Sequence, residues 1–527
     1  MRKLNVLTQI LILLMFGFST CTLESDYIDG ISDKITSDND TQEDPTIDDP
    51  TTEDPTSDDP LPAYGYDVEL EITSAGAGNI ALSWIEPDDS DYDHVEISWS
   101  PEGTSAVNIN KGTTLHTLSG LNNGTVYTVT AKAVSVSGGK ATGHSITMGL
   151  PTSSTIIYCL STAAELAALM DNPTVTMECY YILTKNIDLS SYSSSGGWIP
   201  IGSETNPFTG TFNGNNHIIS NLYINRSSNY QGLFGNVESS SGITSVIRNI
   251  IQENVQVSGN SYTGALVGNG TGIYINNCSA QGIVNGGDYT GGLVGKCTSN
   301  AAYGYIRSSN TSVNVTSTQT GTGGLVGLLT DSSSIYICSS TGSTSGVSMV
   351  GGLVGISQNS SSILMSYSTG AVYATNTNAG GLIGENLGST VSKCYASGSV
   401  SADSDRVGGL IGLSSGPVSN CFATGNLTGT NEMGGLVGSN SNGIDRCFAT
   451  GSVPGASNGG IVAIDTGMVN YCYYDTETTG QTETTGAPTS TAAMKTQSTF
   501  TNWDFSEIWS IDSTINNGYP YLIGMAP

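Results

Sequence analysis

Short apolar runs separated by Gly, Ser, Thr and Asn recur along the chain from residue 232 to residue 463. The runs are rich in Val, Ile and Leu and are too short for helices, so they predict β-strands. The phrase GGLVG and its variants mark the repeat, and its second small residue stands at Gly232, Ala265, Gly292, Gly324, Gly352, Gly381, Gly409, Gly435 and Gly460. Repeats of this length stack, because no single unit can bury its own apolar face. The pattern therefore predicts a parallel β-solenoid whose coils lie about 4.8 Å apart.

The marker glycines are expected at tight corners of the coil, where a Cβ atom would clash or φ must be positive. The most regular of them are Gly324, Gly352, Gly381, Gly409 and Gly435. A further column carries Val or Leu, as at Val400, Leu427 and Val453.

A second column follows the markers at Ile250, Cys278, Ser309, Cys338, Ser366, Cys394, Cys421, Cys447 and Cys472. Stacked Cβ atoms about 4.8 Å apart exceed the roughly 3.5–4.5 Å of a disulfide. We therefore expect Cys394, Cys421 and Cys447 to be buried free thiols that act as small apolar side chains. Ten cysteines in an exported chain would ordinarily suggest disulfides, and a Cys159–Cys179 bond stays an open alternative.

Residues 64–150 contain short alternating strands separated by Gly, Asn, Asp and Pro turns, which is typical of a β-sandwich. The segment IALSWIEP contains Trp84, and LSGLNNGTVYTVTAKAV contains Leu121 and Tyr127. This region resembles a fibronectin type III domain. The resemblance implies that Trp84 is the buried tryptophan and that Tyr127 forms the tyrosine corner.

The repeats NAGGLIGENLGSTVSKCYASGSV and NEMGGLVGSNSNGIDRCFATGSV resemble the GLUG repeats of exported bacterial surface proteins. The resemblance runs from about residue 156 to residue 527, with an N-terminal cap over 156–230 and a C-terminal cap over 486–527. It implies a right-handed parallel β-helix. The expected fold class is thus all-β: an immunoglobulin-like fibronectin type III sandwich followed by a β-solenoid with end caps. Adhesins and large secreted enzymes both occur among such proteins, so the resemblance implies little about activity.

The two ends of the solenoid carry different cap signals. Thr162 and Glu165 predict a capping box at the start of a short helix. Aromatic residues near the C-terminus are expected to cover the open edge of the last coil, and a sugar-stacking platform is the alternative. These residues are Trp503, Phe505, Trp509, Tyr519 and Tyr521.

Residues 1–20 predict a signal peptide of the lipoprotein type, with a basic start, an apolar core and the segment FSTC. FSTC resembles a bacterial lipobox, which implies lipidation of Cys21; an ordinary cleaved signal peptide is the alternative. Residues 21–63 are rich in Asp, Thr and Pro and predict a disordered, extended stalk rather than a calcium-binding tract. With a net charge of −30 and only 15 Lys and Arg, the chain is not expected to bind nucleic acid, and we expect membrane contact through the lipid anchor alone.

Candidate catalytic chemistry is sparse. The acidic residues are dispersed between coils, whereas a glycosidase needs a carboxylate pair at one place. Arg406 and Glu432 occupy matching positions of adjacent coils and predict an exposed ion pair. Gly412-Leu-Ser-Ser-Gly416 matches GxSxG, but it lacks the following helix of a nucleophile elbow. The four histidines are scattered and no CxxC pair occurs, so we predict no catalytic residue, no metal site and no cofactor.

These features favour a cell-surface bacterial lipoprotein, held at the outer membrane by its lipid anchor, that acts as a non-catalytic adhesin for an extracellular glycan or matrix protein. The repeated lateral surface of hydroxyls and amides suits many weak contacts that add up to avidity. Two alternatives stay open: an enzyme acting on polysaccharide or protein, and a structural spacer of the envelope. If Cys21 is not lipidated, the protein is secreted.

Overall fold

The computed structural model describes residues 19–20, 68–76, 78–86, 92–100, 106–122, 126–136, 144–149, 156–170, 179–239, 244–300, 304–455, 458–482 and 485–527. These residues fall into two compact units, which are treated separately below. The predicted stalk with Cys21, and the predicted signal peptide apart from β1 (Ser19–Thr20), lie outside the described residues.

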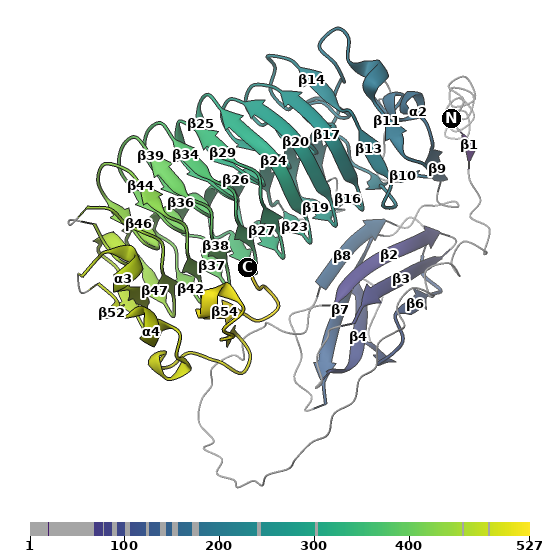
Figure 1. Cartoon of the computed structure of the whole chain (residues 1–527). Helices are drawn as coiled ribbons and strands as arrows, with labels where there is room; N and C mark the ends of the chain where they lie inside the picture. Colours follow the sequence, from purple (N-terminus) through teal and green to yellow (C-terminus); the bar gives the residue numbers. More distant parts are fainter. Residues whose placement is uncertain are drawn as a thin grey trace. The chain divides into compact units, whose positions relative to one another are not determined.

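The N-terminal unit is an antiparallel β-sandwich, as the resemblance implies (Figure 1). One sheet contains β2 (Glu69–Gly76), β3 (Asn79–Ile85) and β6 (Leu115–Leu118). The other contains β5 (Val107–Asn110), β4 (Tyr92–Ser100), β7 (Val126–Ser135) and β8 (His144–Gly149). Trp84 and Tyr127 are both buried between the sheets. The hydroxyl of Tyr127 accepts a hydrogen bond from the backbone N–H of Asn122 at 2.9 Å, which is the contact of a tyrosine corner.

The C-terminal unit is a solenoid of stacked coils whose strands pair in parallel to form four long sheets (Figure 1). Sheet A contains β9 (Ile156–Leu160), β10 (Cys179–Leu183), β12 (Thr211–Asn213), β16 (Ser245–Arg248), β19 (Ile273–Asn276), β23 (Tyr305–Arg307), β27 (Ser334–Tyr336), β32 (Ser362–Leu364), β37 (Thr390–Ser392), β42 (Val418–Ser419), β47 (Gly443–Asp445) and β50 (Met468–Asn470). Sheet B contains β11 (Ile187–Asp188), β13 (Ile218–Ser220), β14 (Tyr223–Asn225), β17 (Ile251–Ser258), β20 (Ser279–Gly286), β24 (Asn310–Ser317), β28 (Ser339–Ser340), β29 (Thr344–Gly346), β33 (Tyr367–Ser368), β34 (Val372–Ala374), β38 (Tyr395–Ala396), β39 (Val400–Ala402), β43 (Phe422–Ala423), β44 (Leu427–Thr428), β48 (Phe448–Ala449), β51 (Tyr473–Asp475) and β52 (Ala487–Thr489).

Sheet C contains β15 (Phe234–Glu238), β18 (Val267–Thr271), β22 (Val294–Thr298), β26 (Val326–Thr330), β31 (Val354–Gln358), β36 (Ile383–Leu387), β41 (Ile411–Ser414), β46 (Val437–Asn440) and β49 (Val462–Asp465). Sheet D contains β21 (Thr290–Gly291), β25 (Thr320–Gly323), β30 (Ser348–Gly351), β35 (Ala379–Gly380), β40 (Val407–Gly408) and β45 (Met433–Gly434). The predicted parallel solenoid is confirmed; its right-handed sense stays a prediction from the resemblance.

One continuous core fills the solenoid because like residues stack on like. Val391 pairs with Val418, and Val418 pairs with Ile444, so a single apolar column passes through three coils. These side chains are almost fully buried and belong to the same apolar cluster as the leucines of the marker phrase, such as Leu382 and Leu410. Burial at roughly 25 cal/mol per Å² of apolar surface is the main stabilising contribution, and each coil gains it only when its neighbour is present.

The marker glycines are required for one of the two expected reasons, because a Cβ atom there would clash with the next coil. The marker glycines do not have positive φ; a Cβ on Gly409 would instead stand 2.1 Å from the carbonyl oxygen of Gly435 on the next coil. The left-handed conformation lies at the residue just before the cysteine column, with φ between 45° and 54° in every coil. These residues are Asn249, Asn277, Ser308, Ile337, Met365, Lys393, Asn420, Arg446 and Tyr471.

The N-terminal cap contains α2 (Ala163–Ala167) and the 3-10 turn η2 (Ser190–Tyr192). The predicted capping box is confirmed: the Thr162 hydroxyl accepts from the N–H of Glu165, and the Glu165 carboxylate accepts from the N–H of Thr162. Leu166 on this helix is fully buried in the solenoid core, so the helix covers the apolar end of the first coils.

The C-terminal cap differs from its prediction in where it packs. It contains α3 (Thr476–Thr479), α4 (Thr491–Met494), η3 (Gln497–Thr499), β53 (Trp509–Ser510), η4 (Asn516–Gly518) and β54 (Tyr521–Leu522). Trp509 and Tyr519 do not lie over the open end of the last coil. They pack against the side of sheet B, where Phe448 is 5.9 Å from the Trp509 ring and 6.5 Å from the Tyr519 ring.

An aromatic ladder on the outside of sheet B explains this position. The residue after each late cysteine is aromatic, and the rings of Tyr367, Tyr395, Phe422 and Phe448 stack at 4.8–4.9 Å with interplanar angles of 2–7°. Without a cover this stripe would be a large exposed apolar patch. The cap buries it, while Met468 on the last strand of sheet A stays 68% exposed.

Candidate functional site

The outer side of sheet B carries a grid of uncharged polar side chains, which we call the hydroxyl face. Its first column is Ser312, Thr341, Thr369, Ser397, Thr424 and Thr450. Its second column is Asn314, Ser343, Ala371, Ser399, Asn426 and Ser452. Its third column is Thr316, Ser345, Tyr373, Ser401 and Thr428. All these side chains are half-buried or exposed, whereas the residues that alternate with them point into the core.

Backbone packing fixes the spacing of this face. Between the first two columns stand Val313 and then, in the five following coils, a glycine, and a Cβ on Gly398 would stand 1.9 Å from the carbonyl oxygen of Gly370. The coils therefore approach as closely as parallel strands do, about 4.8 Å apart. Each coil adds the same set of donors and acceptors one step further along the solenoid axis.

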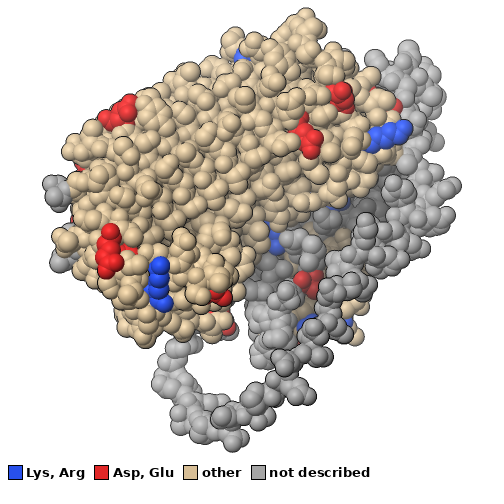
Figure 2. Space-filling model, in the orientation of Figure 1, with Lys and Arg blue, Asp and Glu red and all other residues tan. Residues whose placement is uncertain are grey.

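The hydroxyl face carries few charged side chains. In Figure 1 strands β24, β29, β34, β39 and β44 run along the front of the solenoid, and the same view in Figure 2 shows few charged atoms over it. Asp403 lies at its border, where the carboxylate accepts a hydrogen bond of 2.8 Å from the Tyr373 hydroxyl. The predicted ion pair is confirmed, with 3.4 Å between Arg406 Nε and Glu432 Oε2. An ion pair at this exposure contributes about 0–1 kcal/mol and is a surface feature rather than a catalytic pair.

The cysteine column is buried in the apolar core, and its thiols also form hydrogen bonds. Cys421 Sγ donates to the carbonyl oxygen of Ser419 at 3.0 Å and accepts from the N–H of Cys394 at 3.4 Å. Ser366 forms the same two contacts, to Leu364 O and from Cys338 N. Serine therefore substitutes for cysteine in this column because both side chains can donate and accept, while Ile250 shows that an apolar side chain also fits. The expectation that these thiols are free and buried in the apolar core is confirmed, and the structure adds their hydrogen bonds.

The thiols of this column stay protonated and unlinked. Burial raises the pKa of Cys278 and of Cys338 to about 12 and also raises the pKa of Cys421 well above its usual value. None of the described cysteines forms a disulfide. The Cys159–Cys179 alternative is excluded by register, because Cys159 pairs with Ile182 and Cys179 pairs with Ile156.

The sequence-level catalytic candidates are not brought together. Ser414 of the GxSxG match is buried on β41, where its hydroxyl donates to the carbonyl oxygen of Gly416 at 3.1 Å. It is therefore a structural corner residue and not an exposed nucleophile. Among the residues that the structure describes, no group of three or more His, Cys, Asp or Glu side chains could hold a metal ion. No described helix is long and apolar enough to span a bilayer.

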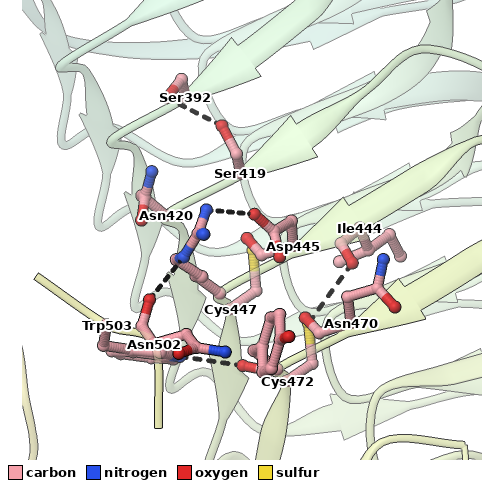
Figure 3. Close-up of polar contacts among 12 residues, drawn as sticks. Ser392, Ser419, Asn420, Ile444, Asp445, Cys447, Asn470, Cys472, Asn502 and Trp503 are labelled. Carbon is pink, nitrogen blue, oxygen red and sulfur yellow. Dashed lines mark hydrogen bonds and ion pairs between the residues drawn. The ribbon is translucent and has the colours of Figure 1, made fainter. Parts of the chain in front are cut away.

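Polar contacts anchor the C-terminal cap to the corner of the last coils (Figure 3). Arg446 pairs with the neighbouring Asp445 carboxylate and donates through Nε to the carbonyl oxygen of Asn502 at 2.6 Å. Trp503 Nε1 donates to the carbonyl oxygen of Tyr471 at 2.9 Å. The cap is thus joined to the left-handed corner residues of two successive coils, which holds its aromatic side chains in fixed positions.

Asp475, the last residue of β51, joins the cap to sheet B. The carboxylate is fully buried; Oδ1 accepts from the N–H groups of Glu477 and Thr478, and Oδ2 accepts from the hydroxyls of Thr491 and Tyr519. Burial, together with this carboxylate, raises the pKa of the Tyr519 hydroxyl, so the phenol remains a donor.

Sequence reasoning missed a second aromatic column on the opposite corner. Tyr230, Tyr262 and Tyr289 are half-exposed, have φ of 57–61°, and stack at 5.3 and 5.4 Å. The Lys296 ammonium lies 5.9 Å from the Tyr262 ring centroid. The signal was present as a tyrosine before the first three marker phrases, in NYQGLFG, SYTGALVG and DYTGGLVG.

Comparison with known proteins identifies two families by their models. The fibronectin type III domain model matches residues 67–148, and the GLUG motif model matches residues 375–401, which span one coil from β35 to β39. The chain is 39% identical over 135 residues to halomucin of Haloquadratum walsbyi, covering 24% of this chain and 1% of halomucin. It is 38% identical over 125 residues to a protein of Evansella cellulosilytica named as a Gly-rich membrane protein, covering 22% of this chain and 14% of that protein.

The chain thus spans only 1% and 14% of the lengths of these two relatives. Among solved structures, one described as an immunoglobulin A1 protease from Bacteroides ovatus is similar with a TM-score of 0.39 and 20% identity, covering 70% of this chain and 92% of that chain. From the two model matches and the fold, the chain consists of a fibronectin type III domain followed by a parallel β-solenoid that contains the GLUG motif.

Proposed function

We propose that this protein is an exported surface lipoprotein, anchored through Cys21, that binds a neutral polysaccharide without catalysis. The hydroxyl face is the observation that carries the proposal. It repeats uncharged side chains, mostly hydroxyls and amides, from coil to coil, with Ala371 as the apolar exception, and a polysaccharide repeats hydroxyl groups along its own chain. Each contact is weak, but many contacts on one rigid surface add up to avidity.

Two further observations support the proposal. One relative is named halomucin and the other is named as a Gly-rich membrane protein, which favours a place at the cell surface. The GxSxG match supplies the other observation: Ser414 is buried and its hydroxyl donates to the carbonyl oxygen of Gly416, so it is not available as a nucleophile, which favours binding over catalysis. A matrix protein is the other ligand class, and it would be recognised by the same polar surface.

The test uses the whole chain and a panel of insoluble polysaccharides, with measurement of both retention and released reducing ends. We expect saturable retention without product. The double variant Thr369→Asp with Ser399→Asp places two charges on exposed positions of the hydroxyl face and should weaken retention by about tenfold, since the charges would have to be desolvated on binding. Ser441→Asp, an exposed serine next to sheet C, is the matched control and should bind like the parent.

Equal retention of the double variant and the control would overturn the role of the hydroxyl face. Release of reducing ends that disappears on heating would overturn the absence of catalysis. The lipid anchor is tested separately: Cys21→Ser should move the protein from the membrane fraction to the medium, and an unchanged membrane fraction would contradict lipidation.

A further inference from the structure

The C-terminal cap contains an open depression that is separate from the hydroxyl face. Its volume is about 720 Å³, which is within the range of ligand sites. Both aromatic and polar side chains line it: Gln497, Ser498, Phe500, Trp503, Asp504, Phe505 and Ser506.

Phe505 presents an aromatic surface in this depression on a rigid support. Phe500 and Trp503 are buried, and their rings lie 6.0 and 6.4 Å from the Phe505 ring. Trp503 itself is held by its hydrogen bond to Tyr471 and by the Trp509 ring at 4.4 Å. Phe505 is only half-buried, so packing of the cap does not account for the exposed part of its ring.

The polar groups of the depression are acceptors and neutral donors. Asp504 Oδ1 accepts all three hydrogen bonds given to this carboxylate by described residues, from the N–H and hydroxyl of Ser506 and from the N–H of Glu507. Oδ2 is left to accept from a ligand. Burial alone would raise the pKa of Asp504, but these hydrogen bonds and the Lys393 ammonium together lower it, so the carboxylate is ionised and fixed in orientation at neutral pH. Gln497 and Ser498 add an exposed amide and an exposed hydroxyl.

The composition of the lining selects a class of ligand. A half-exposed ring favours a ligand with an apolar C–H face, and a carboxylate with an amide and a hydroxyl favours a ligand with several hydroxyl donors. No lining residue is cationic. Lys393 lies within electrostatic range of Asp504 and Glu507, and two carboxylates against one ammonium leave the local charge negative, so acidic sugars are disfavoured. A neutral pyranose meets all three conditions.

We propose that the cap depression binds a neutral pyranose unit, with the sugar face against Phe505 and its hydroxyls donating to Asp504 Oδ2 and to Gln497. The proposal rests on the proposed function only for the class of ligand, because its residues are distinct from the hydroxyl face. The cap would then hold one sugar unit of a strand in a defined place, while the hydroxyl face supplies the many weaker contacts.

The experiment titrates the whole chain with soluble tetrasaccharides of glucose, mannose and N-acetylglucosamine, with tetragalacturonate as the acidic comparison, and measures binding by calorimetry and saturation-transfer NMR. We expect at least one neutral tetrasaccharide to bind and tetragalacturonate to fail. Phe505→Ala should weaken binding by about tenfold and Gln497→Ala by about threefold. Phe505→Trp keeps the aromatic surface and should retain binding.

Ile523→Ala is the matched control, since Ile523 is a 44% exposed apolar residue of the same cap outside the depression, and its variant should bind like the parent. Near-ultraviolet circular dichroism of Trp503 and Trp509 reports whether each variant keeps the cap folded. Binding that survives Phe505→Ala, or is lost in Phe505→Trp with the cap intact, overturns the proposal. If no tetrasaccharide binds while insoluble polysaccharide is still retained through the hydroxyl face, the cap proposal fails and the proposed function stands. If neither tetrasaccharide binding nor retention on insoluble polysaccharide is detected, the cap proposal and the proposed function are both overturned.

Discussion

Substitutions at Cys421 separate two explanations of the cysteine column. If the column requires only a small apolar side chain, the free energy of unfolding should be highest for Val at this position, lower for Ala and lowest for Ser. If it requires the hydrogen bonds seen in the structure, Cys421→Ser should be close to the parent, and Cys421→Ala and Cys421→Val should both be destabilised. Ser309 and Ser366 already occupy the same column, so the serine side chain has a known place there.

The size of the effect follows from the group left without a partner. Removing Sγ leaves the buried N–H of Cys394, which donates to it at 3.4 Å, without a partner, whereas the carbonyl oxygen of Ser419 still accepts from the N–H of Lys393 at 3.2 Å. An unsatisfied buried backbone group costs about 1–3 kcal/mol, and the small cavity adds roughly 1 kcal/mol. We therefore expect Cys421→Ala to lose about 2–4 kcal/mol of unfolding free energy and Cys421→Ser less than about 1 kcal/mol.

Urea unfolding followed by the fluorescence of Trp503 and Trp509 is the assay, because both tryptophans report on the coils next to Cys421. Val418→Ala is the control: Val418 is buried on the preceding strand, and truncation there removes apolar contacts but no hydrogen bond. Scanning calorimetry checks that each variant unfolds in the same number of steps. If Cys421→Val is as stable as Cys421→Ser, or if Cys421→Ala costs no more than Val418→Ala, the hydrogen-bonding explanation is refuted.

Three further predictions test the corner, the glycine column and pH. Ile337 is a β-branched residue with a φ of 51° and 42% exposure, so Ile337→Asn should stabilise the chain by about 1 kcal/mol and raise Tm; a fall in Tm would contradict the corner rule. Gly409→Ala would push a Cβ into the carbonyl oxygen of Gly435 and should cost more than about 3 kcal/mol or abolish folding in an expression and circular dichroism test, whereas easy tolerance would show that the coils can separate. Hydrogen bonds from Asn359 and Thr298 lower the pKa of Asp331 in the folded chain. The carboxylate therefore stabilises the fold at pH values above its pKa in the unfolded chain, near 3.9, and this contribution is lost as the pH falls through its lower pKa in the folded chain. The Tm difference between the parent and Asp331→Asn should therefore shrink between about pH 5 and pH 2, and a constant difference would contradict this assignment.

The solenoid could be predicted because its cause is periodic in the sequence. Leu382 and Leu410 recur with the marker phrase, and every recurrence must bury the same kind of side chain in the same place. The position of the C-terminal cap could not be predicted in the same way. It depends on the aromatic residues after the late cysteines pointing outward. The sequence shows only that a cysteine is followed by an aromatic residue, and it does not show which of the two side chains faces the core. Once Tyr395, Phe422 and Phe448 are known to form an outer ladder, the position of the cap follows, because its own aromatic residues pack against that ladder.

The corner conformation escaped prediction for a different reason. Asparagine at Asn249, Asn277 and Asn420 is the usual sign of a left-handed residue, but Ile337 and Met365 occupy the same position and carry no such sign. The stacked backbone imposes the conformation and outweighs the local preference of these two side chains, which costs roughly 1–2 kcal/mol each. The preference of a residue for a backbone conformation therefore fails to predict that conformation where the coils on both sides already fix the path of the chain.

The same constraint determines where binding can evolve in this fold. A change in the core column, the marker glycine or the corner must be matched by the coils above and below it, because each contacts its counterpart directly. A change on the hydroxyl face or in the cap depression contacts solvent and needs no such match. Residues such as Thr369 and Phe505 are therefore free to be selected for a ligand, whereas Cys421 and Gly409 are not. If the proposed sites are correct, charge substitutions at Thr369 and truncation of Phe505 should change ligand binding with little effect on Tm, and the reverse should hold for Cys421 and Gly409.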